Sequence, residues 1–301
     1  MRIDATATGA KSRAGTIGFL CGVGAAFCWA AGFVAARHGI AVGFSPTDLA
    51  AHRFIWAGLI LLLPALQKGI SDLDGIGWWR GLALTFFGGP VQASISYLGF
   101  NFVPLGHGAV IQPACSALSG LLLAAVILGE PTIASRIIGA IAMVLGLVVF
   151  GAEALTKIGA HGVGGDLLFV WAGVSWGIFG TLLRRWRIGG THAAAVVCVV
   201  SLLLYGPAHG VLFGYARIIA AGWTENLLQV LAQGLLAGVG AIYLFGRTVT
   251  LLGAARASTF PALVPTFALV IGYLALGEVP SVYQLVGLAV VAVGFRFALK
   301  Q

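Results

Sequence analysis

The sequence repeats itself at an offset of 148 residues, and this internal repeat constrains the fold more than any other feature. In the first copy, Pro113 precedes an apolar run that ends at Gly129-Glu130, and the next apolar run carries Gly139 and Gly146. The same order returns in the second copy, at Pro261, Gly277, Glu278, Gly287 and Gly294. At the nearly equal offset of 147, three more residues have counterparts, namely Gly18 with Gly165, Trp29 with Trp176 and Arg37 with Arg184.

The repeat predicts how the chain is divided. Residues 15–151 and 164–301 form the two copies, a polar and basic tail occupies residues 1–14, and a linker occupies residues 152–163. The tail followed by a long apolar run does not match a cleavable signal peptide, so we expect that run to remain as the first membrane helix.

The composition requires a membrane. Hydrophobic residues make up 59% of the chain and charged residues only 9%, whereas ordinary soluble domains carry roughly 25% charged residues. The 45 glycines suit membrane helices, in which small residues let backbones approach closely. The four cysteines lie within apolar runs without metal-ligand spacing, so we interpret them as packing residues. The net charge of +8 comes from residues scattered at helix ends, which argues against nucleic-acid binding.

Hydropathy and helix-end signals predict an all-α integral membrane protein. The capping pattern Ser45-Pro46-Thr47-Asp48 indicates a helix start, and Gly88-Gly89-Pro90 indicates a break inside the third span. We expect ten spans, at residues 16–36, 46–66, 79–102, 106–128, 133–150, 166–183, 192–213, 227–249, 254–276 and 282–299.

The distribution of Lys and Arg predicts the orientation. With both termini in the cytoplasm, thirteen basic residues lie inside and three outside. Because each copy has five spans, an odd number, the second copy enters the membrane inverted. Inverted repeats with interrupted helices are the architecture of many secondary transporters, whose sites lie where the repeats meet. We therefore interpret four prolines as hinge or structural residues of these helices: Pro90, Pro113, Pro261 and Pro265.

Several motifs carry a family resemblance. They are Gly18 and Trp29, Ser45-Pro46 with Arg53-Phe54, Gly165-Asp166 with Trp176 and Arg184-Arg185, and the two Pro…Leu-Gly-Glu hairpins. On these residues the chain resembles the drug/metabolite transporter superfamily, in its ten-helix branch of two EamA-type units. Within that branch it is most similar to bacterial inner-membrane exporters of aromatic and small neutral amino acids. The resemblance implies a central cavity lined by helices 1, 3, 4, 6, 8 and 9, with helices 5 and 10 as peripheral support.

Candidate site residues follow from polar and aromatic side chains on those helices. No catalytic motif, cofactor motif or metal-ligand cluster is present, and no Asp or Glu lies at mid-membrane depth. This absence disfavours proton coupling through a central carboxylate and favours a neutral or zwitterionic substrate. The expected substrate-binding residues are Trp29, Gln92, Ser96, Tyr97, Gln112, Trp176, Tyr243 and Ser258.

Charged residues near the helix ends receive structural interpretations. Arg53 is the most deeply placed charge, and pairing with Asp48 is favoured over contact with substrate. Glu130 and Glu278 are interpreted as interfacial residues that fix each hairpin rather than as binding residues.

The sequence thus predicts a carrier in the bacterial inner membrane that exports small metabolites, above all neutral or aromatic amino acids, by alternating access. It needs a small-molecule substrate and a lipid bilayer but no nucleic acid or cofactor, and a single chain is sufficient. The alternatives are export of drugs, nucleosides or phosphorylated sugars, a membrane-embedded enzyme, and a membrane scaffold without transport activity. Phosphorylated substrates rank lower because only Arg53 offers a deep positive charge, and the interrupted helices argue against a scaffold.

Overall fold

The structure, a computed structural model, describes residues 5–129, 134–153, 159–252 and 260–298. Within these ranges all regular elements are helices and no strand occurs. The first repeat contains α1 (Ala5–Ala41), α2 (Pro46–Lys68), α3 (Trp78–Gly88), α4 (Pro90–Gly99), α5 (Leu105–Leu128) and α6 (Ala134–Glu153). The second contains α7 (Ala160–Trp186), α8 (Gly190–Leu212), α9 (Ala216–Ala220), α10 (Gly222–Gln229), η2 (Val230–Gly240), α11 (Ala241–Leu252), η3 (Phe260–Leu263), α13 (Val264–Leu276) and α14 (Val282–Ala298).

The helices account for the expected spans. Among the described residues, six helices are long and apolar enough to cross a membrane, and three shorter apolar helices accompany them. The α3–α4 pair supplies the remaining span of the first repeat, so the fold is the predicted set of ten transmembrane helices. Their lipid-compatible surface is apparent in side chains such as Leu63, Val126 and Val148, which are 65–72% exposed.

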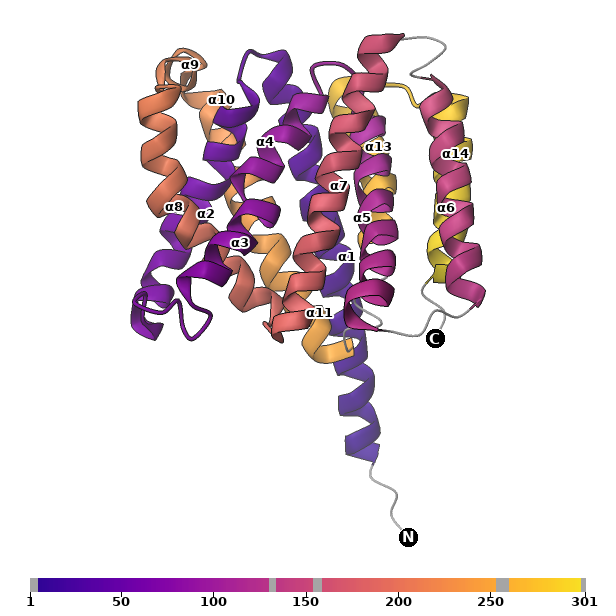
Figure 1. Cartoon of the computed structure of the whole chain (residues 1–301), viewed down its shortest axis with the longest axis horizontal. Coiled ribbons are helices and arrows are strands. Elements are labelled where there is room, and N and C mark those ends of the chain that lie inside the picture. The colour runs from indigo at the N-terminus through magenta and orange to yellow at the C-terminus, as the bar shows by residue number, and fades with distance from the viewer. Residues whose placement is uncertain (1–4, 130–133, 154–158, 253–259, 299–301) are drawn as a thin grey trace.

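The two repeats are inverted with respect to each other. α1 begins, and α14 ends, at one face of the molecule, whereas α7 begins at the opposite face (Figure 1). We call the first of these the terminal face, and the opposite one, which carries α9, the distal face.

The packing follows an approximate two-fold relation between the repeats. The contacts of α1 correspond to those of α7. α1 packs against η3 and α13, and α7 packs against their counterpart, α5. α1 also packs against η2 and α11, and α7 packs against their counterparts, α3 and α4. The two-fold relation exchanges α2 with α8 and α6 with α14, and the two helices of each pair also pack against each other. α6 and α14 stand together at one edge of the bundle, which is the peripheral position expected for helices 5 and 10 (Figure 1).

Spaced glycines explain the α6–α14 contact. A Cβ atom added at Gly146 would lie 2.9 Å from the Gly287 carbonyl oxygen, and one added at Gly294 would lie 2.8 Å from the Gly139 carbonyl oxygen. Only a glycine lets the two backbones approach this closely. The four glycines singled out by the repeat are therefore one reciprocal helix contact.

The third helix of each repeat is interrupted at a matching position. In the first repeat α3 ends at Gly88 and α4 begins at Pro90, and a Cβ atom at Gly89 would collide with the Thr85 carbonyl oxygen. In the second repeat the corresponding segment, which includes Ala237, is the π-helix η2. The expected break in the first repeat is confirmed, and the second repeat uses a different distortion at the same depth.

Several predicted boundaries are corrected. α1 already begins at Ala5, inside the expected tail, and α7 begins at Ala160, inside the expected linker. α9 was not expected, and the span predicted at residues 227–249 begins earlier, at Gly222, where α10 starts. The predicted start of α2 is confirmed, with Pro46 in the first turn and a capping box between Ser45 and Asp48.

Candidate substrate site

A chain of hydrogen bonds joins the two repeats inside the bundle. The Tyr97 hydroxyl donates to the Gln233 side-chain oxygen at 2.9 Å, and the Gln233 amide nitrogen donates to the Gly32 carbonyl oxygen at 2.8 Å. The Arg53 Nη1 atom donates to the Tyr97 hydroxyl at 3.2 Å. These contacts connect α4, η2, α1 and α2, which come from both halves of the chain.

Close backbone packing brings these side chains together. A Cβ atom at Gly32 would lie 2.7 Å from Ala237 Cβ, and a Cβ atom at Gly238 would lie 2.9 Å from Ala57 Cβ. η2 therefore lies directly against both α1 and α2. Gln233 is fully buried at this junction, where the α1 backbone supplies its acceptor.

Two predicted residues on α4 face the neighbouring helices. The Gln92 amide donates to the Ala172 carbonyl oxygen on α7 at 3.2 Å, and the Ser96 hydroxyl donates to the Gln112 side-chain oxygen on α5 at 2.5 Å. Gln92 and Ser96 are buried and Gln112 is partly buried. The structure therefore places four of the predicted residues, Tyr97 included, on adjacent inward-facing surfaces of α4 and α5.

The remaining predicted residues are placed less centrally. Trp29 lies against Phe245 with a centroid distance of 5.4 Å, and Trp176 lies against Phe179 at 5.0 Å. Both tryptophans are partly buried. The Tyr243 side chain is 61% exposed, and Ser258 falls outside the residues that the structure describes.

The four predicted prolines occupy different positions in their helices. Pro90 begins α4 and Pro265 lies in the first turn of α13, where a missing backbone N–H costs least. Pro113 lies inside the continuous helix α5, and its counterpart Pro261 lies in the short 3₁₀ segment η3. The repeat-related prolines thus differ in local structure.

The expected pairing of Arg53 with Asp48 is wrong. Asp48 instead accepts from Arg217 Nε at 3.0 Å through Oδ2 and lies 3.1 Å from His209 Nε2 through Oδ1. Its Oδ2 also accepts the Ser45 backbone N–H at 2.9 Å. Because α8 and the α9 segment provide these partners, both carboxylate oxygens of Asp48 are occupied.

Polar contacts between the repeats cluster at the distal face. Glu278 accepts from Arg37 Nε at 2.8 Å and from the Leu105 backbone N–H at 2.9 Å. Arg37 also donates to the Phe100 carbonyl oxygen at 3.0 Å. Three further contacts share this face, namely His38 with Glu225, His107 with Asp166 and His52 with Asn226. Glu278 thus joins the end of α13 to α1 and to the start of α5, whereas Glu130 lies outside the described residues.

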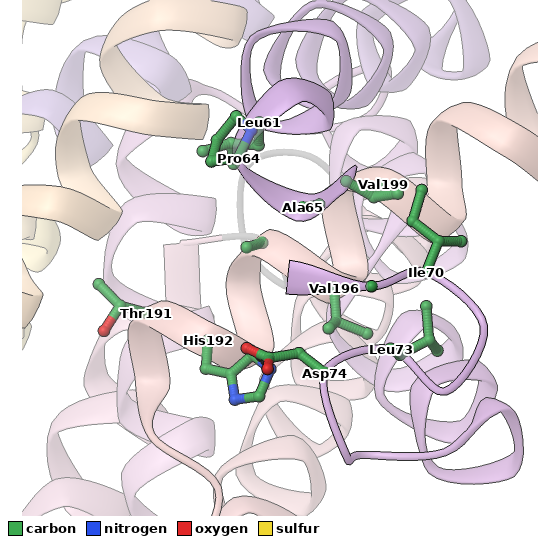
Figure 2. Close-up of a pocket in the computed structure, with 12 residues that line it drawn as sticks. Leu61, Pro64, Ala65, Ile70, Leu73, Asp74, Thr191, His192, Val196 and Val199 are labelled. Carbon is green, nitrogen blue, oxygen red and sulfur yellow. Dashed lines mark ion pairs between the residues drawn. The ribbon is translucent and has the colours of Figure 1, made fainter. Parts of the chain in front are cut away.

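Two small cavities lie away from the hydrogen-bonded chain. One, of about 220 Å³, lies between the terminal-face ends of α2 and α8, with Leu73, Asp74, His192 and Val196 in its wall (Figure 2). The other, of about 250 Å³, lies at the distal face beside Arg37 and Glu278. Both are smaller than the roughly 300–1,000 Å³ of ordinary ligand pockets, so we do not assign the substrate to either.

Sequence reasoning missed several functional candidates. Gln229 and Gln233 are fully buried, and each donates to a carbonyl oxygen of α1. Their signal was present in the sequence, since they are amides spaced one turn apart in an otherwise apolar predicted helix. His209 and Arg217 gave no comparable signal, because only the fold brings them to Asp48.

The described residues contain no group of three or more His, Cys, Asp or Glu side chains that could hold a metal ion. The groups described above inside the bundle are instead amides, hydroxyls, aromatic rings and the Arg53 guanidinium. Such groups can form hydrogen bonds and ring contacts with a small molecule.

Comparisons with known proteins agree with this architecture. The EamA-like transporter family matches twice, over residues 16–152 and 163–299. "Uncharacterized transporter YyaM" of Bacillus subtilis (strain 168) is 26% identical over 83% of this chain and 83% of its own length. "WAT1-related protein At3g02690, chloroplastic" of Arabidopsis thaliana is 27% identical over 89% of this chain and 66% of its own length.

One solved crystal structure has the same fold. It superposes with a TM-score of 0.64 at 22% identity, covering 95% of this chain and 96% of the other. Two consecutive family matches, each spanning five predicted helices, account for nearly the whole sequence. The chain is therefore a multi-pass membrane transporter that belongs to the EamA-like transporter family.

Proposed function

We propose that this transporter exports small amphipathic metabolites, above all neutral and aromatic amino acids, across a bacterial inner membrane by alternating access. The observation that carries the proposal is the polar chain from Arg53 through Tyr97 and Gln233 to α1, located where the inverted repeats interlock. A zwitterionic amino acid needs hydrogen-bonding groups of this kind at its backbone end and apolar or aromatic surface at its side chain.

Aromatic surface is available on α1 and α7. Trp29 on α1 and Trp176 on α7 are related by the repeat, and both remain partly exposed. We assign them to the side chain of the substrate, together with Gln92, Ser96 and Gln112 as polar neighbours. Aromatic rings provide large contact areas and tolerate side chains of different size.

The distal contacts support alternating access. Arg37–Glu278 and His38–Glu225 join the first repeat to the second at one face. Under this proposal, these pairs hold the distal face closed and separate when a path opens there. With the termini in the cytoplasm, the distal face is the outer one, and Pro90, Pro113, Pro261 and Pro265 lie in helices that would bend.

The test is exchange in proteoliposomes that contain the purified full-length protein. A panel of radiolabelled neutral and aromatic amino acids is offered with and without a pH gradient. We expect saturable exchange of aromatic amino acids that protein-free liposomes do not show. Exchange of nucleosides or drugs alone, with no amino acid transported, would overturn the substrate assignment.

A further inference from the structure

We propose that Arg53 is the anchor for the carboxylate of the transported substrate. This proposal rests on the proposed function and names the group of the substrate that this part of the site recognises. Arg53 would act as the counter-charge, while Tyr97 and Gln233 hold its guanidinium in place.

The Arg53 guanidinium has N–H donors that no described residue accepts. An arginine carries five N–H donors, and Arg53 uses one of them, from Nη1 to the Tyr97 hydroxyl at 3.2 Å. Its other close neighbour is the Phe54 ring, whose centroid lies 5.7 Å from the guanidinium carbon. Across the described ranges, no carboxylate lies within 4.0 Å of the Arg53 side chain.

A charge at this depth requires compensation. Arg53 lies seven residues into α2, which places it about 10 Å below the start of the helix at 1.5 Å per residue. The residue is only partly exposed and is surrounded by α2, α4, η2 and α8. Charged residues inside membrane spans are costly and usually serve function, and an anionic ligand group would offset that cost.

The nearest acid in the sequence cannot supply this compensation. Both oxygens of Asp48 are engaged by His209, Arg217 and the capping box. The position that corresponds to Arg53 in the second repeat carries Val200 or Ser201, depending on the offset. At this position of the repeat, a guanidinium is therefore present in the first copy and not in the second, which suits one carboxylate per transport cycle.

The hydrogen-bond directions show how Arg53 is oriented. Because the Tyr97 hydroxyl donates to Gln233, its lone pairs are left to accept from Arg53. Gln233 is held in turn by its amide donation to the Gly32 carbonyl oxygen. The two residues are positioning residues, and the planar fork of the guanidinium can form paired hydrogen bonds with a carboxylate.

The experiment compares ligands that keep the carboxylate with ligands that lack it. Proteoliposomes loaded with unlabelled phenylalanine exchange it for external radiolabelled phenylalanine, and external unlabelled phenylalanine, 3-phenylpropionate, phenylalaninamide and phenethylamine compete with the label. We expect the two carboxylates to compete and the amide and amine to compete about 10- to 100-fold less, the range of a lost charge-assisted hydrogen bond. Phenyl phosphate tests whether any anion suffices, and competition equal to that of phenylalanine would overturn the assignment to carboxylates.

Three variants test the residue itself. Arg53→Gln should raise the KM for phenylalanine by at least about tenfold, and Arg53→Lys should recover part of that loss, because it keeps the charge without the fork. Tyr97→Phe should have a smaller effect, since it removes the orienting contact only. Arg80→Gln is the matched control, because Arg80 is an exposed residue that lies over the Trp186 ring at the terminal face.

The outcomes separate this inference from the proposed function. Amino-acid exchange that is unchanged in Arg53→Gln would overturn the inference and leave the function standing. Absence of exchange by the wild-type protein for every carboxylate would overturn both. If Arg53→Gln fails to fold, equal competition by phenylalanine and phenylalaninamide on the wild-type protein would still overturn the inference.

Discussion

The Nε2 atom of His209 lies 3.1 Å from the Oδ1 atom of Asp48, and neither side chain exposes any surface. Arg217 completes this cluster from the distal side, where half of its own side chain is exposed. The cluster ties the start of α2 to the end of α8 and to α9. It lies at the distal end of α2, the same helix that carries Arg53 deeper in the bundle.

Replacing Asp48 by Asn should lower the free energy of unfolding in detergent by about 1–3 kcal/mol. The amide cannot accept from His209, Arg217 and the Ser45 backbone N–H as the carboxylate does. The loss stays moderate because His209 can remain neutral and Arg217 remains in contact with solvent. Thermal unfolding followed by size-exclusion chromatography measures the difference.

Asp74→Asn is the matched control for this substitution. Asp74 also pairs with a histidine, His192, at 3.2 Å, but both side chains are about a third exposed (Figure 2). An exposed pair contributes less than about 1 kcal/mol. Equal destabilisation by the two substitutions would show that burial does not decide the strength of the Asp48 cluster.

Gly146→Ala should destabilise the protein, by about 1–3 kcal/mol, because the new Cβ would press against the α14 backbone. Gly120→Ala provides the opposite case, since a Cβ atom there meets nothing within 4 Å. In the interior of α5, alanine should gain up to about 1 kcal/mol over glycine. Melting temperatures that shift in the same direction for both variants would contradict the close approach of α6 and α14.

Glu278→Ala should expose the backbone amide of Leu105 to hydrogen exchange. That amide donates to Glu278 Oε2 at 2.9 Å, so removing the carboxylate removes its acceptor. Hydrogen–deuterium exchange measured by mass spectrometry should show faster uptake in the peptide around residues 100–106. Glu225→Ala, which removes the partner of His38, should leave that peptide unchanged, and protection retained in Glu278→Ala would refute the assignment.

Gln112→Ala should reduce amino-acid exchange more strongly than Tyr243→Ala. Gln112 accepts from Ser96 between α5 and α4, whereas Tyr243 is 61% exposed and takes no part in the polar contacts of α4. We expect a rise in KM of about tenfold for Gln112→Ala, as for loss of one hydrogen bond to a charged group, and little change for Tyr243→Ala. Similar values for both would place the substrate beside α11 instead.

Much of the architecture could be predicted because it depends on local signals. Apolar runs of about 20 residues specify membrane helices by length alone, and Gly89-Pro90 specifies a break because neither residue supports a continuous helix. The repeat singled out Gly139, Gly146, Gly287 and Gly294, but their close contact between α6 and α14 appears only in the structure. The polar residues of α4 could be found for the same reason, since an amide or hydroxyl in an apolar helix must face a partner.

The amino-acid sequence alone predicts the class of protein, the inverted repeat and the polar side chains available inside the bundle. Only the tertiary structure decided how those side chains pair. Asp48 and Arg53 are close in sequence but do not pair. Asp48 contacts His209 and Arg217, which lie more than 150 positions away, and Arg53 donates a hydrogen bond to Tyr97. The physical reason is that helix periodicity sets which face a residue occupies, whereas the partner on that face comes from whichever distant helix packs there.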